Sequence, residues 1–469
     1  MVFSSSAYLF AFLPAVLCIY FLCPKVRSLR NLVLLLFSLL FYGWGGLRLL
    51  PLLGYSIVAN YVFGLLVARP KGKKLWLMLA VFANLGLLFC YKYLGFLTEN
   101  LNRLFPALPV VEIALPIGIS FYTFQGLSYV IDVYRGSAER EKNPLNVALY
   151  VAFFPQLVAG PIVRYTTVAE ELRTRRETLS ETAEGLQRFL LGLGKKLLLA
   201  NPMAELADTV FSRTPDALST GMAWLGIIAY SAQIYFDFSG YSDMAIGLGR
   251  VFGFHFPENF NYPYLADSVT DFWRRWHISL SSWFRDYVYI PLGGNRCGKW
   301  KQLRNLLLVW LLTGIWHGAA WNYLLWGLYY GVLLILEKFV FARVLERLPK
   351  AIKHIYALLL IFVGWLIFRA SGGEQTGVFL KAMCFGAADG AWNRQATYLL
   401  LEYRWELCGA VLFSFPVLPA LRRALEKGKT KAGEFVLTWG AGALALVVGA
   451  LSVLHLLASD FNPFIYFQF

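Results

Sequence analysis

The sequence predicts an all-α polytopic membrane protein. Of its 469 residues, 58% are hydrophobic and 15% are charged, a composition that the surface of a soluble globular protein does not have. The apolar residues gather in segments of about 17–25 residues, the length that a helix needs to cross a bilayer. Helices satisfy their own backbone hydrogen bonds in lipid without closing a barrel, so each segment is expected to be helical.

The apolar segments recur along the whole chain without a linker, a low-complexity stretch or an internal repeat between them. By length, they predict roughly 11–13 membrane-embedded helices in a single integral-membrane domain that covers residues 1–469. The expected segments are residues 7–22, 31–47, 51–68, 75–93, 115–133, 145–163, 186–200, 222–236, 244–256, 305–341, 353–370, 398–420 and 435–458.

The net charge of +15 is distributed as in a membrane protein and does not indicate a nucleic-acid partner. Clusters of Lys and Arg follow the first, third and fifth segments and recur later, at residues 25–30, 69–74, 135–142, 296–304, 343–353 and 422–431. The positive-inside rule assigns these clusters to the cytoplasm and the N-terminus to the outside. The last segment then runs outward, so residues 459–469 are expected to form an extracytoplasmic tail.

The cysteines and histidines show no pattern typical of a metal site. The six cysteines are scattered without a CxxC pair, and none of the five histidines has a partner histidine three or four residues away. We therefore expect neither a metal nor a bound cofactor.

His317 lies near the middle of the long apolar segment 305–341. A charged group at membrane depth costs roughly 2.5–3.5 kcal/mol, so an ionisable residue there is by default functional. Apolar surroundings favour the neutral imidazole, which can serve as a general base. The structural alternative is a core histidine that packs against Trp316 and Trp321. If the segment turns near residues 318–322, His317 lies roughly 18 Å into the membrane.

His277 lies in a contrasting segment, residues 271–279, which is amphipathic and basic. Aromatic residues typical of membrane-interface anchors are Trp273, Trp276, Phe284 and Tyr287. Arg274 and Arg275 can face lipid headgroups or hold the phosphates of a substrate. The segment predicts a helix on the cytoplasmic interface, with His277 and these arginines as candidate substrate contacts.

Asp237 and Asp243 place two carboxylates in an otherwise apolar stretch. Such carboxylates must pair with donors or line a wet cavity. They either connect helices to one another or support a catalytic histidine through a hydrogen bond. The nearby glycines, which predict close helix contacts and no dinucleotide site, are Gly192, Gly194, Gly247, Gly249 and Gly253.

Several motifs run through the chain in the order of a known family. They are Leu115-Pro-Ile-Gly-Ile-Ser-Phe-Tyr-Thr-Phe-Gln125, Phe153-Phe-Pro-Gln-Leu-Val-Ala-Gly-Pro-Ile162, Tyr235-Phe-Asp-Phe-Ser-Gly-Tyr-Ser-Asp243, Pro291-Leu-Gly-Gly-Asn-Arg296 and Trp316-His317. The chain thereby resembles a bacterial membrane-bound O-acyltransferase, of the branch with the alginate and peptidoglycan O-acetyltransferases. The teichoic-acid D-alanyl transfer proteins are similar more distantly.

The resemblance implies a ring of helices around a central funnel or tunnel, with re-entrant and interfacial helices and a histidine pair near its narrow point. It implies a bacterial cytoplasmic membrane, acetyl-CoA as the donor, a polysaccharide acceptor and an extracytoplasmic partner of the serine-esterase type. His317 then acts as the base, and His277 orients the donor or polarises its carbonyl. Trp316 and Asn322, beside His317, are candidate substrate-binding residues.

The chain ends in Phe464-Ile-Tyr-Phe-Gln-Phe469, which is either an aromatic interfacial anchor or a functional tail. The ending resembles a C-terminal motif of acetylating family members, in which the tyrosine is thought to accept the acyl group. Tyr466 would then form an aryl ester, which keeps the transfer potential of the acetyl group.

Two other functions remain open from the sequence. One is the transfer of D-alanine or a longer acyl chain from a carrier protein. The other is a proton-coupled transporter in which His317 relays protons, although the absence of repeats and the full-length resemblance favour the acyltransferase.

Overall fold

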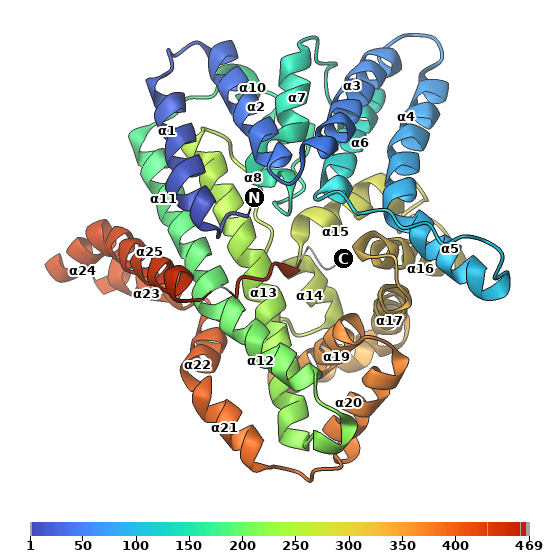
Figure 1. Ribbon diagram of the computed structural model, residues 1–469, viewed down its shortest axis with the longest axis vertical. Coiled ribbons are helices and arrows are strands. Elements are labelled where there is room, and N and C mark those ends of the chain that lie inside the picture. Colours follow the sequence, from blue (N-terminus) through green and yellow to red (C-terminus); the bar gives the residue numbers. More distant parts are fainter. Residues whose placement is uncertain (1, 429, 460, 466–469) are drawn as a thin grey trace. The chain divides into compact units, whose positions relative to one another are not determined.

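The structure, a computed structural model, describes residues 2–428, 430–459 and 461–465 (Figure 1). The regular secondary structure of these residues is helical, without strands, which confirms the predicted all-α class. By their contacts they form two compact units, the first of residues 1–189 and 241–257 and the second of residues 190–240 and 258–469. The helices α11 (Leu179–Gly194) and α13 (Thr220–Val251) each contribute residues to both units.

The first unit is built from helices of very different lengths. They are α1 (Leu13–Leu22), α2 (Arg27–Gly43), α3 (Leu50–Val67), α4 (Lys73–Leu88), α5 (Leu94–Leu104), α6 (Ile119–Arg135), α7 (Pro144–Ala152), α8 (Phe154–Leu157), α9 (Tyr165–Val168) and α10 (Glu171–Thr174), together with parts of α11 and α13.

Helix α6 forms the centre of the first unit, because almost all its residues are buried against α3, α4 and α7. Small residues allow the close approach of α3 and α6. A Cβ atom on Gly64 would lie 2.4 Å from the ring of Tyr129, and one on Gly126 would lie 2.2 Å from the amide of Asn60. Side chains at either glycine would therefore force the helices apart.

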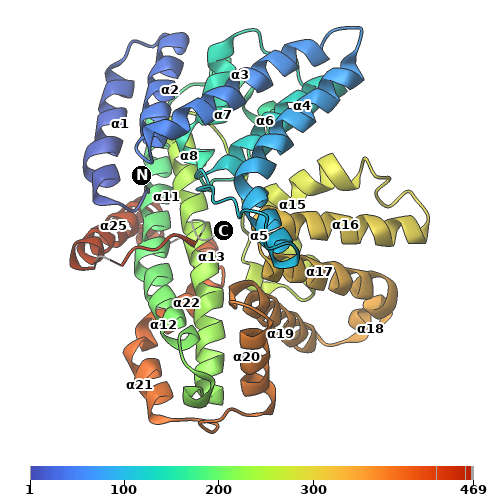
Figure 2. The ribbon, with the colours of Figure 1, turned by 45° about the vertical axis from the view of Figure 1, so that its right-hand side comes forward.

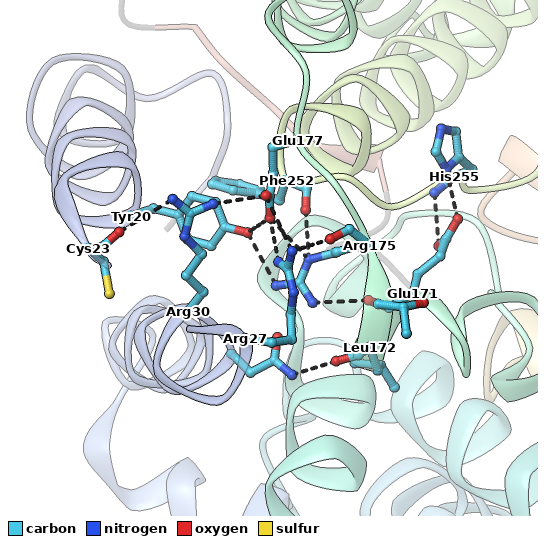
Figure 3. A network of polar contacts seen from close by, with 12 residues as sticks. Tyr20, Cys23, Arg27, Arg30, Glu171, Leu172, Arg175, Glu177, Phe252 and His255 are labelled. Carbon is cyan, nitrogen blue, oxygen red and sulfur yellow. Dashed lines mark hydrogen bonds and ion pairs between the residues drawn. The ribbon is translucent and has the colours of Figure 1, made fainter. Parts of the chain in front are cut away.

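A network of charged groups ties the start of α2 to the connection between α10 and α11 (Figure 3). Glu177 accepts hydrogen bonds from Tyr20, Arg27 and Arg30. Arg175 donates to the hydroxyl of Tyr20 over 3.2 Å. The carboxylate of Glu177 therefore links chain segments that are far apart in the sequence.

The second unit contains the remaining helices. They are α12 (Asn201–Phe211), α14 (Val269–Arg275), α15 (Ile278–Phe284), α16 (Lys299–His317), α17 (Trp321–Leu336), α18 (Ala342–Arg347), α19 (Lys350–Arg369), α20 (Gly373–Phe385), α21 (Arg394–Glu402), α22 (Arg404–Phe413), α23 (Val417–Gly428), α24 (Lys431–Phe435) and α25 (Ala441–Ala458).

Helices α16 and α17 form a hairpin, which Figure 2 shows as two helices side by side. The chain turns between His317, the last residue of α16, and Trp321, the first residue of α17, which meets the condition set in the sequence analysis for a deep position of His317. Gly314 makes this approach possible, since a Cβ atom there would lie 2.4 Å from the carbonyl oxygen of Tyr323. The hairpin places His317 at a buried helix end.

Five helices in the described part of the chain are long and apolar enough to cross a membrane, at residues 47–67, 73–104, 321–347, 350–369 and 432–458. The pair α22 and α23, bent by 60°, could add a sixth. The expected 11–13 membrane-embedded helices also included shorter segments, and residues 145–163 among them fold as the short helices α7 and α8. Exposed apolar side chains on the long helices, Phe82 and Leu446 among them, suit contact with lipid.

Candidate active site

His277 lies at the junction of α14 and α15, with 1% of its surface exposed. Ser268 begins α14 by accepting a hydrogen bond from the backbone N–H of Asp271 over 3.0 Å. The backbone of His277 has a φ of 44°, in the left-handed region that non-glycine residues rarely adopt. Such strained residues gather at functional sites, where the surrounding structure holds them in place.

The aromatic residues around His277 are buried in the protein. Trp273, Trp276, Phe284 and Tyr287 are each between 3% and 9% exposed. Their expected role as anchors at the membrane interface is therefore wrong. An amphipathic pattern has the same period whether its apolar face meets lipid or protein, and here it meets protein.

Asn259 determines which nitrogen of His277 carries the proton. Its side-chain oxygen lies 3.2 Å from the backbone N–H of Ser279, 2.8 Å from the Ser279 hydroxyl and 3.2 Å from His277 Nδ1. Because a backbone N–H can only donate, the atom of Asn259 that faces it must be the oxygen. His277 Nδ1 consequently donates to Asn259, and Nε2 carries a lone pair.

Nε2 of His277 is buried and has no hydrogen-bond partner among the described residues. Burial lowers the pKa of His277 to about 3, so the ring is neutral near pH 7. The ring of Phe238 packs against the imidazole with centroids 4.6 Å apart. His277 therefore offers one hydrogen-bond acceptor in otherwise apolar surroundings.

His317 is 7% exposed and lies among aromatic rings. The ring centroids of Trp316 and Trp326 lie 5.0 Å from that of His317, and the centroid of Phe368 lies 5.4 Å away. A cavity of about 10 Å³ adjoins the imidazole, lined by Ile234, Phe238, Trp276, His317, Trp326, Trp365 and Phe368. This volume holds about one water molecule.

The two histidines belong to one aromatic cluster. Trp316 contacts both, with its ring centroid 5.8 Å from that of His277 and 5.0 Å from that of His317. Phe238 packs against His277 and also lines the cavity beside His317. The fold thus brings together two candidate catalytic residues that are far apart in the sequence.

Arg274 and Arg275 point to different surroundings. Arg275 pairs with Asp271 over 2.8 Å and donates to the carbonyl of Asn261 over 3.3 Å. Arg274 instead lines an open cavity of about 550 Å³. Further charged residues around this cavity are Lys338, Lys353, Asp267, Glu337 and Glu346. Of the two arginines, Arg274 is the one placed to bind an anionic group.

Glu337 also lines this cavity and was not identified from the sequence. Its carboxylate accepts hydrogen bonds from the backbone N–H groups of Val269 and Thr270 over 2.7 and 2.8 Å, and from the Thr270 hydroxyl over 2.6 Å. It therefore caps the N-terminus of α14, the helix that leads to His277. The only signal in the sequence was an acidic residue at the end of a long apolar segment.

The other candidate residues lie in several places. Asn322 donates to the carbonyl of Phe368 over 3.0 Å and so supports a residue of the aromatic cluster. Asp237 pairs with Lys196 over 2.8 Å in the second unit, and Asp243 pairs with Arg188 over 2.7 Å in the first. Tyr466 lies outside the described residues.

Comparisons with known proteins point to one family. The family model of the membrane-bound O-acyltransferases matches residues 138–371. The chain is 40% identical to the probable alginate O-acetylase AlgI of Azotobacter vinelandii over 100% of both proteins. It is 37% identical to the peptidoglycan O-acetyltransferase of Helicobacter pylori over 82% of this chain and 80% of that protein. The teichoic acid D-alanyltransferase of Bacillus subtilis is 31% identical over 55% of this chain and 69% of that protein.

Proposed function

The chain belongs to the membrane-bound O-acyltransferase family, and we propose that this acyltransferase moves acetyl groups from cytoplasmic acetyl-CoA across the membrane to a polysaccharide of the cell envelope. The observation that carries the proposal is the shared aromatic cluster of His277 and His317. The names of the alginate and peptidoglycan relatives support acetyl as the group transferred and a polysaccharide as the acceptor.

His317 and His277 take different roles in the proposed reaction. A general base works best with a pKa near the working pH, and the His277 pKa of about 3 does not suit that role. His317 is therefore the base. Nε2 of His277 accepts a hydrogen bond that orients a substrate; without a proton on this atom, His277 cannot polarise the thioester carbonyl by donating to it.

The proposed acceptor within the protein is the phenol of Tyr466. His317 takes the phenolic proton, the phenolate oxygen attacks the thioester carbonyl, and the carbon–sulfur bond breaks. The departing thiolate takes up the proton, which leaves free coenzyme A and an aryl acetate on Tyr466. An extracytoplasmic partner of the serine-esterase type then moves the acetyl group to a polysaccharide hydroxyl.

The cavity at Arg274 supports an anionic donor. Arg274 and Lys338 line it, and cationic side chains are the usual partners of phosphate groups. Of the other charged residues there, Lys353 pairs with Asp267 over 3.6 Å, and Glu337 accepts hydrogen bonds from the backbone of α14. Arg274 also belongs to α14, which ends beside His277. We infer that the phosphates of acetyl-CoA bind in this cavity, with the thioester directed toward the histidines.

The small cavity beside His317 argues against a long acyl chain. Its volume of about 10 Å³ suits one water molecule, so even an acetyl group requires some movement of the surrounding rings. A long acyl chain would require displacement of the buried tryptophans. The same apolar lining suits the methyl group of acetyl better than the charged ammonium group of D-alanine.

The proposed direction of transfer requires the donor site in the cytoplasm and the tail outside the cytoplasmic membrane. Reporter fusions after residues 72 and 348 are expected to report cytoplasm, and an epitope at position 459 is expected to be accessible from outside. A cytoplasmic epitope would contradict the direction of transfer.

The decisive experiment compares His317→Ala and Tyr466→Phe with the wild type and with Phe467→Tyr as a matched control. With acetyl-CoA supplied and the partner absent, mass spectrometry should find a hydroxylamine-labile acetyl group on the wild-type C-terminal peptide. Both test variants should lack this group, while Phe467→Tyr keeps it. Polysaccharide acetylation should fall about 10²–10⁴-fold in His317→Ala, the usual contribution of a base, and should be lost in Tyr466→Phe, which has no acceptor oxygen. Full polysaccharide acetylation in Tyr466→Phe would eliminate the tyrosine as acceptor.

A further inference from the structure

The last two described residues, Phe464 and Ile465, are buried in the second unit. Phe464 is 4% exposed and Ile465 is 1% exposed. Figure 1 shows this red segment running back from the end of α25 to α13. An interfacial anchor would expose such side chains to lipid headgroups, so the burial of these two side chains calls for another explanation.

A buried ion pair lies under the segment. Lys196 and Asp237 are joined by a contact of 2.8 Å, and their side chains are 3% and 2% exposed. A buried ion pair is weak evidence of stability, because removing two charges from water costs about as much as their attraction returns. Stability is therefore a weak explanation of its presence.

Both members of the pair also bind the main chain of the tail. The ammonium group of Lys196 donates to the carbonyl of Pro463, and Asp237 accepts from the backbone N–H of Ile465 over 2.8 Å. The ammonium group also lies 5.9 Å from the ring centroid of Phe464. The two charged residues thus hold a donor and an acceptor of the tail on either side of Phe464.

Asn201 adds a third contact one helical turn further on. Its side-chain amide donates to the carbonyl of Phe461 over 3.0 Å and to the side-chain oxygen of Asn462 over 3.4 Å. We name Lys196, Asn201 and Asp237 the tail clamp.

One residue of the tail clamp adjoins the candidate active site along α13. Asp237 precedes Phe238, whose ring packs against His277 and lines the cavity beside His317. Ile465, whose backbone N–H the clamp binds, is the residue directly before Tyr466 in the sequence. The clamp therefore acts on the chain immediately before the proposed acceptor.

We propose that the tail clamp binds the main chain of residues 461–465 and so positions Tyr466 at the two histidines. The inference rests on the proposed role of Tyr466 as acyl acceptor. Binding through the main chain fixes the register of the tail, since a shift by one residue would exchange the carbonyl and N–H groups that face Lys196 and Asp237. Lys196, Asn201 and Asp237 are positioning residues, because they act on the reaction only through the tail.

The first test measures the tail directly in the full-length protein. In the variant Ile465→Cys the new thiol replaces a buried side chain while the backbone N–H that binds Asp237 remains. Maleimide labelling of this thiol, followed on the C-terminal peptide by mass spectrometry, should be slow. Adding Asn201→Ala should accelerate it modestly.

Breaking the ion pair requires a variant that still folds. A single substitution would leave one buried charge alone, whereas Lys196→Met combined with Asp237→Leu replaces both by apolar groups of similar size, which is often neutral for stability. This double substitution removes two charge-assisted contacts to the tail and should accelerate labelling about ten- to hundredfold. Arg188→Gln breaks another ion pair between α11 and α13 and serves as the control, with labelling unchanged.

The second test separates positioning from general damage. In Lys196→Met/Asp237→Leu with Ile465 intact, acetylation of Tyr466 should fall at least about tenfold through kcat. The KM for acetyl-CoA should stay unchanged, because neither residue lines the cavity at Arg274. A parallel rise in KM would indicate a general structural defect and would overturn the inference.

The two proposals fail in different ways. Slow labelling in the double-substituted protein would overturn the tail clamp, whether or not Tyr466 is acetylated. Fast labelling in that protein would support the tail clamp. If wild-type Tyr466 then carried no acetyl group, only the acceptor role of the tyrosine would be overturned.

Discussion

Asn259 is expected to control the reaction through the tautomer of His277. It holds the proton on Nδ1 and leaves Nε2 as an acceptor. In Asn259→Ala this hydrogen bond is lost, which disfavours the present tautomer by about 1 kcal/mol. The hydroxyl of Ser279, 3.5 Å from Nδ1, loses its own acceptor at the same time and becomes available to donate to Nδ1. That new bond favours a proton on Nε2 by about another 1 kcal/mol.

The combined change of about 2 kcal/mol corresponds to a roughly 30-fold decrease in the competent tautomer, at 1.4 kcal/mol for each factor of ten. Acetyl transfer by purified Asn259→Ala should fall by about this factor. Adding Ser279→Ala removes the competing hydroxyl and halves the energetic change, so the double variant should be only about fivefold slower than the wild type. A second mutation at the site would thus restore activity.

The assay is acetyl transfer from acetyl-CoA to the C-terminal peptide, with thermal unfolding measured in parallel. Asn259→Asp gives a further check, because its carboxylate keeps the acceptors and raises the pKa of His277. Below that raised pKa Nε2 is protonated, so this variant should lose activity as the pH falls. Wild-type activity in Asn259→Ala, or a double variant slower than the single one, would refute the tautomer argument.

Three shorter predictions concern the donor cavity and the first unit. Arg274→Ala should raise the KM for acetyl-CoA about tenfold, while Arg275→Ala changes this KM little. Equal effects of the two substitutions on KM would contradict the proposal that the donor's phosphates bind in the cavity at Arg274. Glu337→Ala leaves two backbone N–H groups of α14 without their acceptor, so it should lower the free energy of unfolding by about 2–4 kcal/mol. An unchanged midpoint of thermal unfolding would contradict the capping role. Burial alone would raise the pKa of Glu177, but hydrogen bonds from Arg27 and Tyr20 outweigh it and lower the pKa to about 2 from 4.5. Its contribution to stability is present above pH 4.5 and lost as the pH falls toward 2, so the difference in stability between wild type and Glu177→Gln should shrink over that range.

The sequence predicted the helical class and allowed a turn after His317, in both cases for clear physical reasons. Apolar segments of spanning length admit little besides helices in lipid, and glycines beside His317 permit a sharp change of direction. Periodicity and composition could not show that His277 and His317 meet, because the contact depends on how separate helices pack. That expectation came from the resemblance to a family.

The surroundings of His277 were the least predictable part of the site. Asn259 precedes α14 in an irregular stretch, and a lone asparagine in a loop carries no signal of a histidine partner. The aromatic residues near His277 fit an interfacial helix as well as a buried one, because hydropathy does not distinguish lipid from protein neighbours. Glu337 was missed for a similar reason, since its partners are backbone groups, which a sequence pattern does not specify.

Asp237 shows how a correct inference can still leave the partner open. A carboxylate in an apolar stretch had to find a donor, and the sequence offered either another helix or a catalytic histidine. The donor is Lys196, and this choice matters for the histidines. An uncompensated negative charge beside Phe238, which packs against His277, would stabilise the imidazolium and remove the lone pair on Nε2. The ion pair of Asp237 with Lys196 is neutral overall. Charged groups can therefore bind the tail without stabilising a proton on His277.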